Sequence, residues 1–540
     1  MPRKLLLAKS FAVSLLGLAG TIVEVESEIS SSLPGFVLVG LPDASLSEAK
    51  DRVRAAIQNS GLKMPDRRVT VNLSPASVRK QGSSFDLAIA VSVIAAVGEL
   101  KTNSIAEWVH LGELGLDGSV RKIHGILPSL LVAKKAGFSN AIVPAANLAE
   151  ASLVEGMHII GVSNFREVAR LHGANLDLDQ NQDIAEASNG KISELVIDAK
   201  SFIQLDMADV LGQEDAVEAL TVAAAGGHHL LMVGPPGAGK TMMAERLTSI
   251  LPDMSLDQAL ETTAVLSISG SRNIAEDSLV LRPPFEAPHH SASVSSLVGG
   301  GLGMPRPGVI SLANNGVLFL DEAPEFQKPV LEALRQPLES GEVVINRSGG
   351  TARFPAKFQL VLAANPCPCG NAHGAGRNCR CNDNQRAKYL AKLSGPLLDR
   401  VDIRLTINPA SPAQLAIARQ SEANQASSAQ LRTQVAEARK RSAQRFLGTP
   451  WVVNSQVPGT YLRKHFPIEA SAVAKLEDAL TKGRISMRGF DRCLRLAWSI
   501  ADLAGRNTPS QFDVAKAIFL RGAEDFATSE NSFKRGKSNA

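Results

Sequence analysis

The chain has 540 residues, of which 44% are hydrophobic, and a formal net charge of +4. Its length predicts about three domains, and its apolar content excludes a wholly disordered chain. The overall charge does not indicate a nucleic-acid partner, although residues 371–450 hold 13 Lys and Arg against 5 Asp and Glu. That local excess suits either a phosphate-binding groove or a solvated helical face.

Neither a membrane span nor a secretion signal is predicted. The longest apolar run, residues 87–98, is shorter than the roughly 18 residues that a spanning helix needs. Lys9 interrupts the apolar stretch near the N-terminus, and residues 21–25 continue as a strand-like segment. Four of the five cysteines lie between 367 and 381, which favours a reducing compartment over a disulfide framework. We therefore expect a cytoplasmic protein without a membrane partner.

Residues 1–175 are predicted to form an α/β domain, because short strand-like runs alternate with helical patterns. The strand-like runs are residues 35–39, 69–73 and 141–143, and the helical patterns are residues 45–59 and 85–97. Residues 176–205 are predicted to be a linker, since the stretch from 175 to 190 is polar and nearly free of large apolar side chains.

The rest of the chain divides into two further regions and a tail. Within residues 206–407, apolar strand-like runs recur, and each is followed by a loop with a distinctive residue. This pattern predicts a parallel sheet with its functional residues at the strand ends. Residues 408–528 are predicted to be helical, because they are rich in alanine, arginine and lysine. The tail, residues 529–540, is expected to be disordered.

The first of these distinctive loops is glycine-rich. Residues 228–233 form an apolar strand that runs into the motif G-x-x-x-x-G-K-T and then into a helical segment. In this context, backbone N–H groups and the helix N-terminus face phosphates. Lys240 is predicted to reach the β- and γ-phosphates of ATP, and Thr241 to bind Mg²⁺. The predicted ATP-binding residues of the loop are Gly234, Pro235, Pro236, Gly237, Ala238, Gly239, Lys240 and Thr241.

A second strand-like run, residues 316–320, ends in Asp321 and Glu322. About 80 residues after such a loop, we interpret Asp321 as a ligand of Mg²⁺ and Glu322 as the base that orients the attacking water. A third run, residues 360–364, ends in Asn365, which either senses the γ-phosphate or forms a turn before Pro366. Arg400, at the end of a short helical segment, is predicted to contact the γ-phosphate bound by a neighbouring subunit.

The cysteine cluster has two possible explanations. Its spacing is C-x-C, nine residues, then C-x-C, which is tighter than the usual spacing of zinc ligands. Either the four thiols hold a structural Zn²⁺ that fixes the intervening loop, or they are reduced thiols near the nucleotide site. The residues concerned are Cys367, Cys369, Cys379 and Cys381.

Several segments together resemble the magnesium-chelatase-like AAA+ ATPases, and among these the ComM/YifB family. They are GPPGAGKT, RPPFEAPHHSAS (282–293), PRPGVISLANNGVLFLDE (305–322), LRQPLESGEVVINR (334–347), AANPCPCG (363–370) and SGPLLDR (394–400). Residues 35–61 and 69–90 resemble the Lon-like domain of that branch, and residues 486–505 resemble its C-terminal helical domain.

The resemblance implies an α/β fold with a Lon-like (S5-type) domain at 1–175, an AAA+ P-loop ATPase core at 206–407 and a helical lid at 408–528. It implies an ATP-binding Gln213, a second sensor at Arg488, and a pre-sensor hairpin at 343–354 with Arg347 and Ser348 near its tip. It also implies a homo-hexameric ring that binds DNA. Related ComM proteins act as helicases that drive branch migration in natural transformation, so other recombination proteins are possible partners.

A Lon-like domain raises the possibility of peptidase activity, which requires a serine and a lysine base. Ser84 falls near the nucleophile position, but residues 126–129, where the lysine is expected, read Ile-Leu-Pro-Ser. A serine without its base is a weak nucleophile. We therefore expect a scaffold or DNA-contacting domain.

The sequence thus predicts an ATP hydrolase that acts as a DNA motor. One alternative is a magnesium-chelatase motor subunit that promotes metal insertion into a tetrapyrrole. A non-catalytic scaffold is disfavoured because the predicted ATPase residues are all present.

Overall fold

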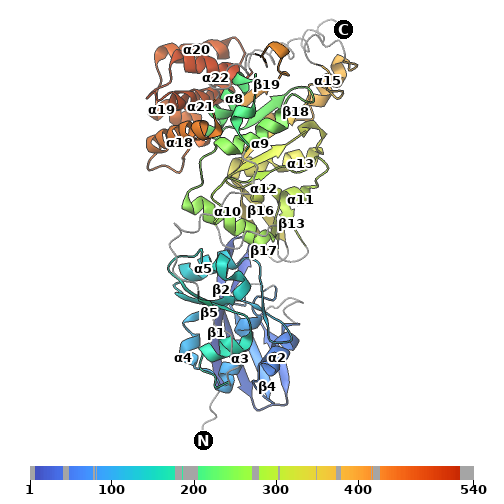
Figure 1. Cartoon of the computed structure of the whole chain (residues 1–540), viewed down its shortest axis with the longest axis vertical. Coiled ribbons are helices and arrows are strands. Elements are labelled where there is room, and N and C mark those ends of the chain that lie inside the picture. Colours follow the sequence, from blue (N-terminus) through green and yellow to red (C-terminus); the bar gives the residue numbers. More distant parts are fainter. Residues whose placement is uncertain are drawn as a thin grey trace.

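The computed structural model describes residues 6–40, 48–76, 80, 82–176, 185–186, 205–270, 279–301, 305–347, 350–372, 379–414, 416 and 426–522. They form an elongated molecule, with an N-terminal α/β part at one end and the C-terminal helices at the other (Figure 1). The expected linker lies outside the described residues except for 176, 185–186 and 205, and the expected disordered tail lies wholly outside them.

An eight-stranded mixed sheet forms the N-terminal part, in the order β10-β9-β8-β5-β1-β2-β4-β3. Its longest strands, β1 (Leu6–Leu16) and β2 (Ala19–Ser30), form an antiparallel hairpin. Buried and half-buried residues alternate along most of β2 because successive side chains point to opposite faces. Helix α3 (Asp86–Val97) packs on this hairpin, and every residue of it except Val97 is buried.

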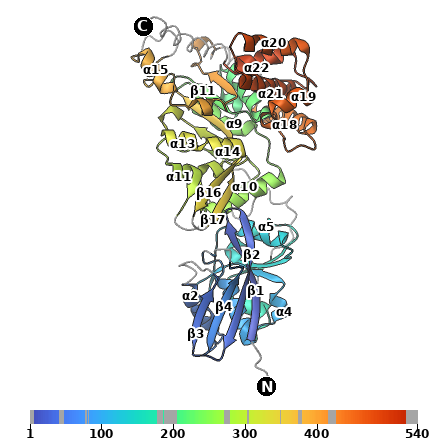
Figure 2. The same cartoon turned by 180° about the vertical axis from the view of Figure 1, so that it is seen from behind.

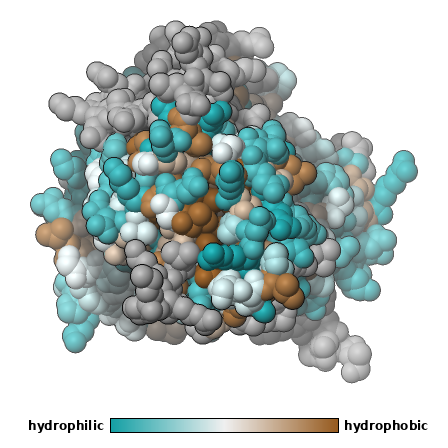
Figure 3. All heavy atoms as spheres, turned by 90° about the horizontal axis from the view of Figure 1, so that it is seen from below, coloured by the Kyte–Doolittle hydropathy of each residue, from teal (hydrophilic) through white to brown (hydrophobic). Residues whose placement is uncertain are grey.

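Each strand expected in this part is present, at 35–39 (β3), 68–74 (β4) and 140–144 (β8). The two expected helices are present at 49–59 (α2) and 86–97 (α3). The remaining elements of this part are β3 (Gly35–Val39), α2 (Ala49–Asn59), β4 (Arg68–Ser74), α4 (Thr102–Ile105), β5 (Trp108–His110), β6 (Glu113–Leu114), β7 (Val120–Arg121), α5 (Ile126–Lys135), β8 (Asn140–Pro144), α6 (Leu148–Ala151), β9 (His158–Val162), α7 (Phe165–Leu171) and β10 (Ala185–Glu186). Seen from this end, the surface mixes hydrophilic residues with smaller hydrophobic areas (Figure 3).

The central part contains a five-stranded sheet in the order β12-β15-β18-β11-β19, and every pair of neighbours is parallel. The strands are β11 (Leu230–Val233), β12 (Phe285–Glu286), β15 (Val317–Leu320), β18 (Gln359–Ala364) and β19 (Ile403–Thr406). All residues of β15 and β18 are buried, as expected for a parallel sheet covered on both faces. The parallel sheet predicted for residues 206–407 is therefore present.

Helices, and short strands outside this sheet, complete the central part. The helices are α8 (Glu214–Gly226), α9 (Lys240–Ile250), α10 (Leu256–Ser269), α11 (Val294–Val298), α12 (Val309–Leu312), α13 (Lys328–Ala333), α14 (Arg335–Ser340), α15 (Asp383–Leu390) and α16 (Gly395–Leu398). Two strand pairs lie outside the main sheet: β13 (Gly299–Gly300) with β14 (Arg306–Pro307), and β16 (Glu342–Arg347) with β17 (Gly350–Pro355).

The C-terminal part consists of helices, as predicted for this region. They are α18 (Ser428–Arg445), α19 (Gly459–His465), α20 (Ala470–Thr481), α21 (Met487–Leu503) and α22 (Gln511–Leu520). Their apolar faces share one core with α8, α9 and the central sheet. No helix among the described residues is long and apolar enough to cross a membrane.

A buried polar network fixes these helices to the central sheet. The ring of His228 contacts Asp402 at 3.1 Å and Ser499 of α21 at 2.7 Å, and Arg492 of α21 pairs with Asp402. Burial alone would raise the pKa of Asp402, but Arg492 and His228 hold it well below its ordinary value. Because unpaired buried charges are costly, the network favours one arrangement of helices and sheet.

The N-terminal part docks onto the central part through the turn of its long hairpin. Gly17, between β1 and β2, forms a parallel bridge with Arg353 of β17, and Leu15, Leu16 and Leu18 pack against the core around β16 and β17. Figure 2 shows β1 and β2 reaching β17. Ala264 of α10 also packs within the core of the N-terminal part. The two parts thus share buried apolar contacts as well as backbone pairing.

Candidate functional site

The glycine-rich loop lies between β11 and α9, at the carboxyl edge of the central sheet. Gly237 and Gly239 have φ values of +76° and +85°, which glycine adopts without a Cβ clash. Lys240 Nζ donates to the carbonyl oxygens of Gly234 and Pro235 at 2.7 and 2.9 Å. Burial lowers the pKa of Lys240, while Asp321 and Glu322 oppose this shift. The loop, its lysine and the two acidic residues therefore form one group.

Thr241 and Asp321 meet at the end of β15. The Thr241 hydroxyl donates to Asp321 Oδ2 at 2.8 Å. A threonine hydroxyl after the glycine-rich loop and an aspartate after another strand of the same sheet are the side chains that phosphoryl-transfer sites offer to Mg²⁺. The pair therefore fits the expected magnesium site, where the ion would neutralise phosphate charge.

Glu322 follows directly and occupies an unusual backbone conformation. Its φ is +49°, one of two positive values at non-glycine residues in the described chain. Its N–H donates to Asp321 Oδ1 at 2.9 Å, and its half-exposed carboxylate lies 3.7 Å from His290 Nδ1. Backbone strain of this kind concentrates at functional sites. The carboxylate is thus accessible to water, as the predicted base requires.

Asn365 lies beside the same lysine. It follows β18, and its Oδ1 accepts a hydrogen bond from Lys240 Nζ at 3.1 Å. The sheet order places β18 between β11 and β15, so the three predicted strand ends are neighbours. Asn365 therefore lies where a γ-phosphate sensor is expected, and its role in sensing stays a prediction.

Gln213 also borders the loop. It precedes α8, and its side-chain amide donates to the carbonyl oxygens of Ala238 and Asn408 at 3.2 and 3.4 Å. These bonds tie the chain entering the central part to the phosphate-binding loop. The contact suits the ATP-binding position that the resemblance implies.

The two predicted arginines lie apart from this group. The guanidinium of Arg400, which follows α16, donates to Pro396 O at 2.5 Å and pairs with Glu339 of α14. Arg488, in the first turn of α21, pairs with Asp399 at 3.0 Å and is largely exposed. Burial and the nearby charges of Arg335, Arg492 and Arg488 lower the pKa of Arg400. Several positive charges thus gather around Arg400.

The hairpin predicted at 343–354 is present as β16 and β17. Arg347 is the last residue of β16 and is exposed. Its neighbour Ser348, also expected near the tip, lies outside the described residues. Gly300 lies close to the side chain of Arg347. A Cβ atom added at Gly300 would be 3.2 Å from the guanidinium of Arg347.

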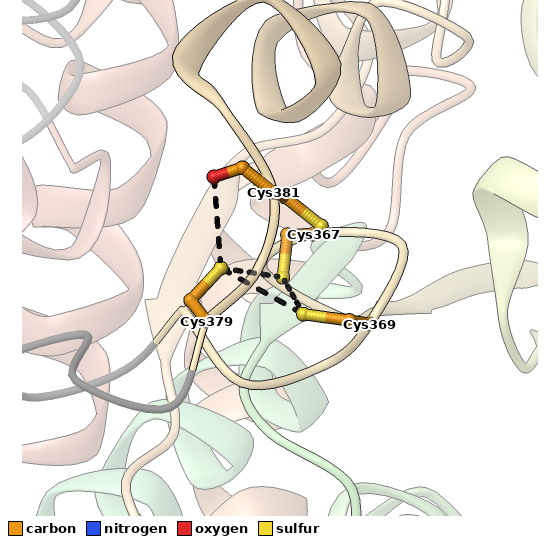
Figure 4. Close-up of side chains that lie close together, drawn as sticks. All are labelled: Cys367, Cys369, Cys379 and Cys381. Atoms are coloured by element: carbon orange, nitrogen blue, oxygen red, sulfur yellow. Dashed lines mark hydrogen bonds between the residues drawn. The ribbon is translucent and has the colours of Figure 1, made fainter.

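The four clustered cysteines converge in space (Figure 4). Cys367 Sγ lies 3.4 Å from Cys369 Sγ and 3.7 Å from Cys379 Sγ, and all four sulfurs lie within 4.8 Å of one another. Zn–S bonds of about 2.3 Å in a tetrahedron place sulfurs about 3.8 Å apart. Backbone N–H groups of Asn371 and Arg380 lower the pKa of Cys369 to about 6, whereas, against a backbone hydrogen bond at Cys369, burial and the neighbouring thiols raise the pKa of Cys381 to about 11. The four residues could therefore hold a metal ion.

This cysteine cluster lies against the glycine-rich loop. A Cβ built at Gly370, between Cys369 and Asn371, would lie 2.7 Å from the ring of Pro236 in the glycine-rich loop. Cys367 follows Asn365 by two residues. An ion in the cluster would thus restrain the segment that carries Asn365.

In the described N-terminal part, residues 126–129, the stretch where a lysine base is expected, begin helix α5. The four residues of this stretch, Ile-Leu-Pro-Ser, are all buried. The buried Lys80 donates to the carbonyl oxygen of Pro75. The absence of peptidase activity at Ser84 stays a prediction.

Two residues at the site were not predicted from the sequence. His290, which contacts Glu322, and Glu339, which contacts Arg400, lie within segments that supported the family resemblance, but no role followed for either. The sequence signal for His290 is its place in the segment RPPFEAPHHSAS, which supported the resemblance without assigning the histidine a role. For Glu339 there is none, because its partner is far along the chain.

Comparisons with known proteins identify the family. "Magnesium chelatase, subunit ChlI" matches residues 206–415, "Subunit ChlI of Mg-chelatase" residues 25–147, and "Magnesium chelatase, subunit ChlI C-terminal" residues 425–521. Competence protein ComM of Haemophilus influenzae is 39% identical over 95% of this chain and 97% of its own length. The chain belongs to the ComM/YifB family of magnesium-chelatase-like proteins. Two uncharacterized proteins are matched with similar coverage. YifB of Escherichia coli is 37% identical over 94% of this chain and 96% of its own length. A protein of Mycobacterium tuberculosis is 46% identical over 95% of this chain and 98% of its own length.

Membership of this family and the geometry of the loop together support an AAA+-type ATPase. The likeness to a chelatase subunit is more distant. The magnesium-chelatase 38 kDa subunit of Rhodobacter capsulatus is 27% identical over 29% of this chain and 49% of its own length. The Lon-like character of the N-terminal part and the lid function of the C-terminal helices stay predictions.

Proposed function

We propose that this ComM/YifB-family chain is an ATP-driven DNA motor. In this proposal it assembles as a homo-hexameric ring in the cytoplasm and promotes branch migration or related DNA remodelling, together with other recombination proteins. The observation that carries the ATPase part is the convergence of Lys240, Thr241, Asp321 and Asn365 at three adjacent strand ends. ATP is the substrate, and Mg²⁺ held by Thr241 and Asp321 would neutralise charge on its phosphates.

These contacts support a separate role for each residue of the site. The loop and Lys240 hold the phosphates, Glu322 orients and deprotonates water, and Asn365 senses the γ-phosphate. Arg488, on the C-terminal helices, would report the nucleotide to the lid, since its partner Asp399 adjoins Arg400. The cluster of positive charge around Arg400 would attract the γ-phosphate bound by a neighbouring subunit.

The DNA part rests on different observations. The ComM relative is named a competence protein, and this chain matches 97% of its length. Arg347 is exposed at the end of β16, where a ring would narrow around a strand, and residues 371–450 carry a local excess of positive charge. The deciding experiment is the ATPase rate with and without single-stranded DNA, beside a protoporphyrin control. Stimulation by protoporphyrin and not by DNA would favour the chelatase-type motor.

Arg347→Ala is expected to weaken coupling to DNA while basal hydrolysis survives. The reason is that Arg347 contacts neither the glycine-rich loop nor the acidic residues after β15. Losing one phosphate contact should reduce the slope of log affinity against log salt by about 0.7 for single-stranded DNA. ATPase rates and DNA binding at two salt concentrations measure both effects. Lys328→Ala in α13, which also removes an exposed positive charge, is the matched control. Equal DNA coupling in both variants would contradict a role for Arg347.

We also propose that the cysteine cluster holds structural Zn²⁺. Protein purified without a metal-binding tag is expected to contain about one zinc per chain, since four thiolates form one tetrahedral site. Elemental analysis measures this, and Cys369→Ser should lower the zinc content sharply. Cys493→Ser, which changes the one cysteine outside the cluster, should keep it. A zinc content near zero in well-folded wild-type protein would show that the four residues are ordinary reduced thiols.

A further inference from the structure

The segment that carries Arg400 is held at its backbone by arginines of the C-terminal helices. It spans residues 399–402, between α16 and β19. Arg492 of α21 donates to the carbonyl oxygen of Arg400 at 3.1 Å. Arg521, just after α22, donates to the carbonyl oxygens of the next two residues. Both guanidinium groups therefore hold the main chain at and beside Arg400 rather than its side chain.

A buried carboxylate fixes Arg492 in turn. The nitrogen that donates to Arg400, Nη1 of Arg492, also pairs with Asp402 Oδ1. The second carboxylate oxygen of Asp402 lies 3.1 Å from His228 Nδ1, and both of these residues are buried. Asp402 N donates to His229 O at 3.0 Å, directly before β19 pairs with β11. Arg492 thus connects the backbone of Arg400 to the rigid central sheet.

Two arginines of α21 contact this segment, and they differ in exposure. Arg488 and Arg492 are four residues apart and therefore lie on one face of the helix. Arg488 pairs with Asp399 at 3.0 Å, but its side chain is 81% exposed, whereas that of Arg492 is 17% exposed. Exposed ion pairs contribute little to stability. Of these two arginines, Arg492 therefore provides the firmer hold on Arg400.

We propose that Arg492 is a positioning residue for Arg400, and that it serves the ATP bound by the neighbouring subunit rather than the ATP of its own chain. This inference rests on the proposed ATPase function and adds how Arg400 is held in place. With Arg492 bonded to it, the main chain at Arg400 keeps one position relative to the central sheet and α21. The guanidinium of Arg400 then extends toward the neighbour from a fixed point.

A simpler explanation is that Arg492 only neutralises Asp402, and two variants distinguish the alternatives. Arg492→Ala alone would leave a buried charge unpaired, which is strongly destabilising. Arg492→Ala is therefore combined with Asp402→Asn, whose amide oxygen still accepts from His228, and is compared with Asp402→Asn alone. The double variant is expected to have a kcat about 10- to 100-fold lower, the range for a misplaced catalytic group. Its affinity for a fluorescent ATP analogue should be unchanged. Equal kcat in the two variants overturns the inference.

Arg463→Ala is the matched control for losing an arginine of the C-terminal helices. Arg463 of α19 pairs with Asp491, the neighbour of Arg492 in α21, and its side chain is partly exposed. This variant should keep the wild-type kcat. A loss of kcat as large as that of the double variant would show that any disturbance of α21 slows hydrolysis, and would overturn a specific role for Arg492.

Mixed assemblies show which ATP site Arg492 serves. Mixed with Glu322→Gln subunits, the double variant should regain activity, at interfaces where its own Glu322 meets a correctly held Arg400. Mixed with Arg400→Ala subunits it should regain none, because every subunit then presents a missing or misplaced arginine. The reverse pattern would place Arg492 in the site of its own chain and overturn the inference. An inactive wild type would instead overturn the proposed function, and a fully active Arg400→Ala the role assigned to Arg400.

Discussion

Replacing Glu322 by glutamine is expected to lower kcat by roughly 10²- to 10⁴-fold while ATP still binds, because the amide cannot accept a proton from water. Lys240→Ala should instead abolish binding, since Lys240 belongs to the phosphate-binding loop. A fluorescent nucleotide measures binding, and released phosphate measures turnover. Glu325→Gln is the matched control, because it neutralises an exposed carboxylate three residues away that pairs with Lys392. Normal turnover in Glu322→Gln would falsify the assignment of the base.

Arg400→Ala is expected to lower kcat by roughly 10³- to 10⁵-fold, the range for an arginine that stabilises charge on the transferred phosphoryl group. ATP binding should persist, because Arg400 is not in contact with the phosphate-binding loop of its own chain. Mixing Arg400→Ala with Glu322→Gln subunits should restore part of the activity, through interfaces where an intact arginine meets an intact base. Rates of mixed and separate variants, with co-assembly shown by labelled subunits, measure this.

Glu339→Gln provides the control for this result. It breaks the ion pair of Arg400 within the chain but leaves the guanidinium in place. If Arg400 served only to hold α14, both variants would lose the same activity. Substantial hydrolysis in Glu339→Gln beside an inactive Arg400→Ala therefore supports action across the subunit interface. Mixtures no more active than the separate variants would rule that action out.

The sequence was sufficient to predict the strands that build the candidate site. The runs at β15 and β18 end in a distinctive polar residue, and the run at β11 leads into the glycine-rich loop, so these patterns are visible without tertiary structure. Parallel strands bring their carboxyl ends to one edge, so the meeting of Thr241 with Asp321 followed from the fold class. The choice between a sensor and a turn at Asn365 was open; its bond to Lys240 brings the side chain beside the glycine-rich loop, and the sensing role stays a prediction.

What the sequence could not predict are contacts that depend on the order of strands and the packing of helices. The pairing of Glu322 with His290 requires β12 to lie beside β15, which no local pattern reveals. Arg400 and Glu339 are polar surface residues about 60 positions apart, and such pairs leave no periodic signal. The approach of Gly17 to Arg353 joins two domains that the sequence showed only as separate compositional regions.

That last contact limits how the hairpin can move. The turn at Gly17 is paired with the backbone of Arg353, and Leu15, Leu16 and Leu18 pack against the core beneath β17. If the hairpin moves during the proposed ATP cycle, it must either carry the whole N-terminal part with it or break these contacts. Because buried apolar packing resists separation, we expect the hairpin and the N-terminal part to move as one body.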